Sequence, residues 1–150
     1  MYKKLFQIVF LAFILFITAS FAAAHCEVPC GIYDDEMRFK MIAEHIATIE
    51  KAMRQVTAIQ GKEKVDYNQI VRWILTKEQH ANALQKIVTQ YFMTQRILPG
   101  ADNYMKKMSL LHKMLVEAMK CKQSTDLSHT TTLNSLQKEF HNVYFGGQHE

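Results

Sequence analysis

The sequence predicts an all-α protein, an antiparallel four-helix bundle with a metal-binding hook at its N-terminus. Apolar residues recur at spacings of three and four along four stretches of the chain, which is the periodicity of amphipathic helices. The chain has two Pro and five Gly among 150 residues, placed mostly at the breaks between these stretches. The links between the stretches are short, which favours antiparallel neighbours in a bundle.

Residues 1–24 have the features of a secretory signal peptide. Two lysines near the start precede an apolar run, and three alanines at positions 22–24 offer a cleavage site for signal peptidase. An uncleaved membrane anchor is the alternative, although the run is short against the ~20 residues of a stable span. We therefore expect a cleaved leader and a mature chain exported to the periplasm or the extracellular space.

The mature chain carries little net charge. Removing the two lysines of the leader takes the formal charge from +4 to +2. So small a surplus does not indicate a nucleic-acid partner, but it is compatible with a small anionic substrate. The remaining chain is long enough for one domain with its own core, and we assign residues 34–150 to the four-helix bundle.

The first two helices are predicted on either side of the break at residues 60–62. Asp34 can cap the first helix, and acidic residues follow it in the first turn. Asp66 can cap the second helix, which Leu-Pro-Gly at residues 98–100 ends. The positions predicted to face the core are Ile42, Ile46, Ile49, Met53 and Val56 in the first helix and Ile70, Trp73, Ala81, Leu84, Val88 and Tyr91 in the second.

The third and fourth helices are predicted in the same way. Asp102 can cap the third helix, which ends at the polar residues 122–125, and Asp126 or Ser128 begins the fourth. The inward positions are Met105, Met108, Leu111, Leu115 and Ala118 in the third helix and Leu133, Leu136, Phe140 and Val143 in the fourth. Methionines at core spacings are interpreted as packing residues, since Met fills irregular gaps.

The segment that follows the predicted cleavage site has the chemistry of a metal hook. Residues 25–33 read His-Cys-Glu-Val-Pro-Cys-Gly-Ile-Tyr. After cleavage, His25 offers a free α-amine and an imidazole beside the thiols of Cys26 and Cys30. The amine, the amide between His25 and Cys26, and the two sulfurs can form a planar set, which leaves the imidazole for an axial position. Such donors indicate Ni(II) or Cu(II) rather than the tetrahedral zinc site.

A small disulfide between Cys26 and Cys30 is the alternative, because an exported protein meets an oxidising compartment. A bound metal would instead hold both side chains as thiolates and keep them from pairing. The third cysteine, Cys121, is expected to be structural or merely tolerated.

The motif at residues 25–33 closely resembles that of nickel superoxide dismutase, His-Cys-x-x-Pro-Cys-Gly-x-Tyr at a processed N-terminus. The resemblance extends through Lys-Glu-Gln-His-Ala at residues 77–81 and Gln-Tyr-Phe at residues 90–92, and covers essentially residues 25–150. It implies an enzyme that converts superoxide to dioxygen and hydrogen peroxide while nickel alternates between +2 and +3. It also implies one nickel ion per subunit and a homohexamer of four-helix bundles.

The resemblance assigns roles to individual residues of the hook. It implies that His25, Cys26 and Cys30 are the metal ligands, with the His25 imidazole axial in the oxidised state. Tyr33 matches the catalytic tyrosine beside the open face of nickel, and Tyr91 matches its partner from the second helix. Their hydroxyls would order water and admit only small substrates. The alternative for either residue is an ordinary packed tyrosine.

The chain departs from some of these relatives around the axial imidazole. There a glutamate on the first helix and an arginine on the second orient the ring. Here His80 stands at the arginine position and Met41 or Ile42 at that of the glutamate, with Glu44 one turn away. His80 is therefore a candidate neighbour of the nickel ligands, and a satisfied helix histidine is the alternative.

A non-catalytic exported carrier of nickel or copper is the alternative function for the same hook. Binding without turnover of superoxide would distinguish a carrier from an enzyme. A haem or di-iron bundle fits the helices but not the motifs, because the chain has no C-x-x-C-H and no glutamate with a histidine three residues later.

Overall fold

The structure is a computed structural model that describes Lys3 and residues 34–146. These residues form α2 (Asp35–Gln60), α3 (Tyr67–Lys86), the π-helix η1 (Ile87–Arg96), α4 (Tyr104–Gln123) and α5 (Ser128–Phe145), and no strand occurs among them. The predicted all-α fold is confirmed for this part of the chain. The predicted signal peptide and the nickel hook lie outside the described residues.

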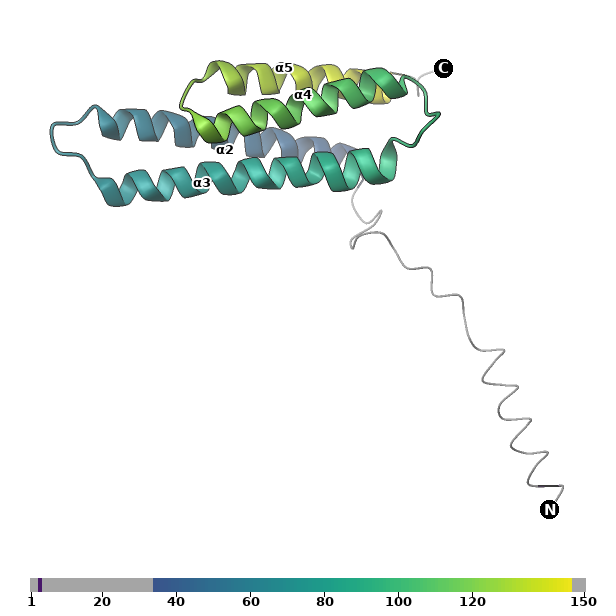
Figure 1. The fold of residues 1–150 in the computed structure, drawn as a ribbon, viewed down its shortest axis with the longest axis horizontal. Helices are drawn as coiled ribbons and strands as arrows, with labels where there is room; N and C mark the ends of the chain where they lie inside the picture. The colour runs from purple at the N-terminus through teal and green to yellow at the C-terminus, as the bar shows by residue number, and fades with distance from the viewer. Residues whose placement is uncertain (1–2, 4–33, 147–150) are drawn as a thin grey trace. The chain divides into compact units, whose positions relative to one another are not determined.

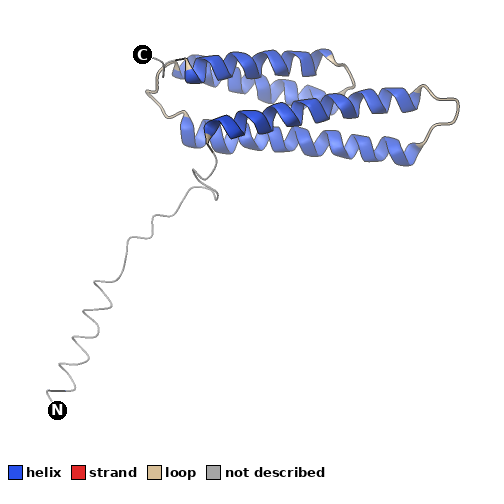
Figure 2. Cartoon of the chain, turned by 180° about the vertical axis from the view of Figure 1, so that it is seen from behind, coloured by secondary structure: helices blue, strands red, loops and turns tan. Residues whose placement is uncertain are grey.

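The helices pack as two antiparallel hairpins. Since η1 continues α3 without a break, α2 and the α3–η1 rod form one hairpin, and α4 with α5 forms the other (Figure 1). Contacts of α2 with α5 and of α3 with α4 close the bundle. The end of the first hairpin that carries the α2–α3 turn extends past α4 and α5 in both views (Figures 1 and 2). None of the described helices combines the length and apolar character that a membrane span requires.

The predicted caps are confirmed for α2 and α3. Asp34 Oδ1 accepts a hydrogen bond of 2.8 Å from the backbone nitrogen of Met37, and Asp66 Oδ1 accepts one of 3.1 Å from that of Gln69. The predicted cap at Asp102 is wrong by one residue, because Asn103 precedes α4. Asn103 has φ 54°, in the left-handed region that asparagine tolerates better than most residues.

The core follows the predicted stripes, except at Ile70, Trp73 and Met105. Ile70 and Trp73 of α3 were predicted to face the core, but they are only half-buried and are not among its buried residues. All five apolar positions predicted to face inward from α2 are buried, as are Ala81, Leu84, Val88 and Tyr91 in the second rod. Met105 was predicted to face the core, but it is 76% exposed. Met105 lies in the first turn of α4. The apolar periodicity of the sequence includes this turn, but the neighbouring helices do not bury the side chain.

Aromatic side chains fill one end of the core. Phe39 of α2, Phe92 of η1 and Phe140 of α5 are all buried. Their ring centroids lie 4.9 Å apart for Phe39 and Phe92, 5.2 Å for Phe39 and Phe140, and 5.0 Å for Phe92 and Phe140. Aromatic pairs at such separations contribute beyond the area they bury, so this cluster ties three rods together.

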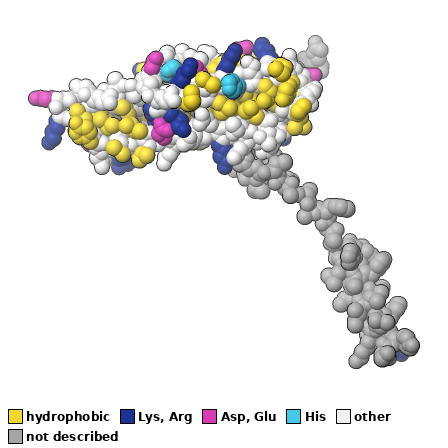
Figure 3. Space-filling model, viewed as in Figure 1, with side chains coloured by type: hydrophobic (Ala, Val, Ile, Leu, Met, Phe, Trp, Pro, Cys, Tyr) yellow, Lys and Arg dark blue, Asp and Glu magenta, His cyan; other side chains and the backbone are white. Residues whose placement is uncertain are grey.

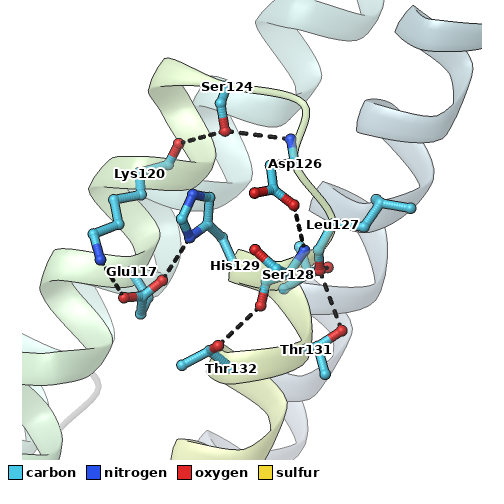
Figure 4. Close-up of polar contacts among 10 residues, drawn as sticks. Glu117, Lys120, Ser124, Asp126, Leu127, Ser128, His129, Thr131 and Thr132 are labelled. Carbon is cyan, nitrogen blue, oxygen red and sulfur yellow. Dashed lines mark hydrogen bonds and ion pairs between the residues drawn. The ribbon is translucent and has the colours of Figure 1, made fainter.

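A polar cluster fixes the connection between α4 and α5 (Figure 4). Glu117 accepts a hydrogen bond of 2.7 Å from Lys120 Nζ and lies 2.8 Å from His129 Nδ1 of α5. At the start of α5, Asp126 Oδ1 accepts a bond of 2.9 Å from the backbone nitrogen of Ser128. The side chain of Glu117 is only 13% exposed, so its carboxylate depends on these partners.

We predict that Glu117→Gln lowers the free energy of unfolding by roughly 1–2 kcal/mol near pH 6, because charge-assisted bonds are weakened. Burial raises the pKa of Glu117, but the bonds from Lys120 and His129 outweigh it and hold the pKa below 4.5. The stabilisation is therefore present above pH 4.5 and is lost as the pH falls through the folded-state pKa. Thermal unfolding of the unaltered protein and of Glu117→Gln between pH 3 and 6 measures the difference in stability.

The exposed Glu139 provides the control, since its side chain is 52% exposed. Glu139→Gln is expected to change stability by less than about 0.5 kcal/mol at any of these pH values. A Glu117→Gln deficit that stays constant down to pH 3 would contradict the assigned role of the carboxylate.

Candidate functional site

The predicted site residues fall into two groups. His25, Cys26, Cys30 and Tyr33 lie outside the described residues, and the structure places only His80 and Tyr91. Within residues 34–146, no group of three or more His, Cys, Asp and Glu side chains is arranged to hold a metal ion. The described part of the site is therefore the surroundings of these two side chains.

Tyr91 is the centre of a hydrogen-bonded network at the start of α2. It lies in η1 and is 4% exposed. Its hydroxyl donates a hydrogen bond to Asp35 Oδ1, and Arg96 Nη2 donates to the Tyr91 hydroxyl at 2.9 Å. Arg96 Nε also donates to Asp35 Oδ1 at 2.9 Å, and the Tyr144 hydroxyl of α5 donates to Asp35 Oδ2 at 2.7 Å. We call these four residues the Asp35 network.

The π-helical geometry of η1 brings Tyr91 and Arg96 together. In a π-helix the backbone bonds join residues five apart, so residues at that spacing lie on one side of the rod. The same spacing recurs in the bond of 2.8 Å from the Thr94 hydroxyl to the Thr89 carbonyl. In an α-helix, neighbours on one face are three or four residues apart, and Arg96 would not reach the Tyr91 hydroxyl in this way.

The charges of the Asp35 network support one another. Burial raises the pKa of Asp35, but the bonds from Tyr91 and Tyr144 and the Arg96 guanidinium outweigh it, so the pKa lies below its ordinary value. Burial, together with the Asp35 carboxylate, raises the pKa of Tyr91 and of Tyr144 above 10. At neutral pH the network therefore consists of a carboxylate, a guanidinium and two neutral phenols.

Two guanidinium groups flank the Tyr91 ring. The Arg38 guanidinium carbon lies 4.6 Å from the ring centroid and that of Arg96 lies 4.8 Å from it. Both distances are within the range of cation–π attraction. The ring is thus fixed by cations and the hydroxyl by the Asp35 network.

His80 pairs with a residue that the sequence did not indicate. Its Nδ1 lies 3.0 Å from His45 Nδ1 of α2, so one ring must donate its proton and the other accept it. Burial, together with the charge of His80, lowers the pKa of His45. Glu44 is exposed, and His45 rather than Glu44 lies against His80.

The structure does not bring His80 and Tyr91 together. The two residues are eleven positions apart along the α3–η1 rod, which corresponds to roughly 16 Å along the axis. His80 therefore belongs to a separate contact between α2 and α3. Of the two predicted residues that the structure describes, only Tyr91 lies in the Asp35 network.

Cys121 lies in the core, as expected for a structural thiol. It is fully buried in α4, and burial raises its pKa to about 11. The group is therefore a protonated thiol at neutral pH, whereas metal ligation requires a thiolate.

Sequence reasoning missed three residues of the Asp35 network. Asp35 was interpreted only as an acidic residue in a first helical turn, and Arg96 and Tyr144 were not singled out. A spacing of five residues carries no signal in an α-helical pattern, and Tyr144 approaches Asp35 only through the packing of α5 on α2.

The comparisons with known proteins identify the family. The family model of nickel-containing superoxide dismutase matches residues 20–148, which include both the motif at residues 25–33 and the described bundle. No curated protein and no solved structure matches the chain. Nickel is the metal of this family and superoxide dismutation its activity, and no observation of the described residues favours a metal carrier. The chain belongs to the nickel-containing superoxide dismutase family.

Proposed function

We propose that residues 25–33, once freed from the leader, bind one nickel ion per chain and that superoxide is dismutated there. The observation that supports this proposal is the position of the motif. It lies within the matched range 20–148 and begins directly after the three alanines of the predicted cleavage site. Cleavage after Ala24 makes His25 the first residue of the mature chain.

The donor set of the hook fits nickel. The thiolates of Cys26 and Cys30 and the deprotonated amide between His25 and Cys26 are strong anionic donors, which suit Ni(II) and stabilise its higher oxidation state. The α-amine and imidazole of His25 complete the set. Cys121 does not compete, because its thiol is buried and protonated.

Nickel, when bound, supplies a one-electron redox couple through which two superoxide ions and two protons give dioxygen and hydrogen peroxide. The chain holds the metal and controls access. We assign Tyr33 to substrate handling, since it closes the motif and carries a hydroxyl that can order water. Tyr91 is assigned to the same role from η1, with its hydroxyl fixed by the Asp35 network. His80, which pairs with His45, is assigned as a supporting residue of the nickel site.

We propose that signal peptidase exposes the amine and that the enzyme works outside the cytoplasm, in the periplasm or the extracellular space. The leader pattern of residues 1–24 supports export.

A homohexamer is proposed as the assembly, and an exposed apolar surface supports self-association. Tyr67, Val71 and Leu75 of α3 are 74%, 54% and 55% exposed and follow one another at a spacing of four. Ile74, at 39%, adjoins them. They lie on the part of the first hairpin that extends past α4 and α5, where Figure 3 shows hydrophobic side chains gathered at the surface. Apolar surface of this kind is a common site of protein contact.

The first test of the proposed function uses one added residue. A mature protein with an alanine before His25 should fold into the same helices but fail to form the nickel centre. The reason is that the His25 nitrogen becomes a peptide amide and one donor is lost. Nickel content and superoxide dismutation, measured side by side on the two proteins, check this. The change adds no charge, cysteine or histidine, and equal activity would refute amine ligation by His25.

The second test separates the cysteines. Cys26→Ser and Cys30→Ser should abolish nickel retention and activity, because a hydroxyl is a poor donor for Ni(II). The helical circular dichroism should persist. Cys121→Ala is the control, since it removes a buried thiol at a cost of about 1 kcal/mol in stability but leaves the hook intact. If Cys121→Ala loses nickel as Cys26→Ser does, the ligand assignment is wrong. Nickel retained by the unaltered protein without turnover would indicate a carrier.

A further inference from the structure

We infer that Asp35, Arg96 and Tyr144 are positioning residues that hold the Tyr91 hydroxyl as a hydrogen-bond acceptor for the reaction at residues 25–33. The inference rests on the proposed function of that segment. It assigns to these residues a role that neither the motif nor the family match provides. The argument depends on the bonds of the hydroxyl, the fixation of the carboxylate and the position of Asp35 in the chain.

The bonds of Tyr91 determine what its hydroxyl can still do. A phenol offers one donor and two acceptor lone pairs. The donor is used on Asp35 Oδ1, and one lone pair accepts the bond of 2.9 Å from Arg96 Nη2. Among the described residues no other group bonds to this hydroxyl, so one lone pair is left. The hydroxyl can therefore accept a further bond, from water or from the Tyr33 hydroxyl, but it cannot donate one while Asp35 is in place.

The Asp35 carboxylate is itself held from three sides. Its oxygens accept from Tyr91 and Arg96 of η1 and from Tyr144 of α5. The Tyr144 ring packs in the aromatic end of the core, with its centroid 5.6 Å from Phe39 and 5.5 Å from Phe92. A carboxylate fixed in this way keeps its orientation without reorganisation, which is what a supporting residue of a reactive site must do.

Chain connectivity ties the network to the hook. Two peptide units separate Tyr33 from Asp35, so the Cα of Tyr33 cannot lie more than about 7 Å from that of Asp35. The intervening Asp34 caps α2 through its bond to the Met37 nitrogen, which anchors the chain at this point. Asp35, which fixes the Tyr91 hydroxyl, thus lies two residues after the last residue of the hook.

A second polar contact between the start of α2 and the end of α5 serves as a control for Asp35. Glu36 Oε2 lies 2.8 Å from His141 Nε2, so it also joins the start of α2 to α5. It makes no contact with Tyr91 in the described network. A purely structural role for Asp35 predicts similar effects from the two contacts, whereas a positioning role predicts an effect from Asp35 alone.

The test is a double-mutant cycle on the nickel-loaded protein. Asp35→Asn should lower kcat/KM for superoxide about tenfold with nickel content unchanged, because the bond to a charged acceptor is weakened. Tyr91→Phe should cause a loss of similar size. Since Asp35 acts through the Tyr91 hydroxyl, adding Asp35→Asn to Tyr91→Phe should cause no further loss. Glu36→Gln should leave kcat/KM within about twofold of the unaltered protein, and Tyr144→Phe, which removes one hydroxyl, should give a smaller loss than Asp35→Asn.

A second readout does not depend on turnover. With ring-¹³C tyrosine, the Tyr91 resonance is assigned from its absence in Tyr91→Phe, and its titration is followed by NMR. Asp35→Asn should lower the pKa of Tyr91, because the carboxylate and its bond help to raise it, while Glu36→Gln should not. Additive losses in the cycle, or an unchanged Tyr91 titration in Asp35→Asn, would overturn the inference. Absence of dismutation in the unaltered nickel-loaded protein would refute the proposed function instead, with the NMR comparison still reporting on the network.

Discussion

The end of the bundle at the start of α2 depends on the hydrogen bonds that the Asp35 carboxylate accepts. Asp35 lies in the first turn of α2 and accepts bonds from η1 and α5, so that three rods meet on two oxygens. Partial burial alone would favour the protonated acid, but the Arg96 guanidinium and two phenols keep it ionised. The aromatic cluster of Phe39, Phe92 and Phe140 lies next to it along α2 and holds the same three rods. Apolar packing sets the spacing of the rods, and the Asp35 carboxylate fixes the side chains of Tyr91, Arg96 and Tyr144.

Much of the fold could be predicted, because its signals are local. The caps at Asp34 and Asp66 depend on bonds to nitrogens three residues later, and the buried stripe of α2 is a periodicity within one helix. Met105 could not be placed, since its exposure depends on where the surface of the bundle ends. The π-helix was missed for a related reason. The π-helix brings Tyr91 and Arg96 together although they are five residues apart. In an α-helix, residues at that spacing lie on different faces.

The candidate site was predictable to the extent that its residues are contiguous. The nickel donors follow one another in residues 25–33, so their chemistry can be recognised without a structure, and the family match covers that segment. Tyr91 could be indicated only by resemblance. Its partner Asp35 lies at the start of α2 and is bonded in turn by Tyr144 at the end of α5. These two residues are more than 100 positions apart in the sequence and meet only in the folded bundle. The pairing of His80 with His45 likewise required the packing of α2 on α3.

The most direct test of the account is metal analysis of the purified mature protein together with its N-terminal sequence. The account predicts about one nickel per chain, the number one such donor set can hold, in a protein whose first residue is His25. Loss of nickel on chelation should remove superoxide dismutation in proportion. Stoichiometric zinc in place of nickel, or full dismutation by a nickel-free protein, would contradict the central claim that residues 25–33 form a processed nickel hook.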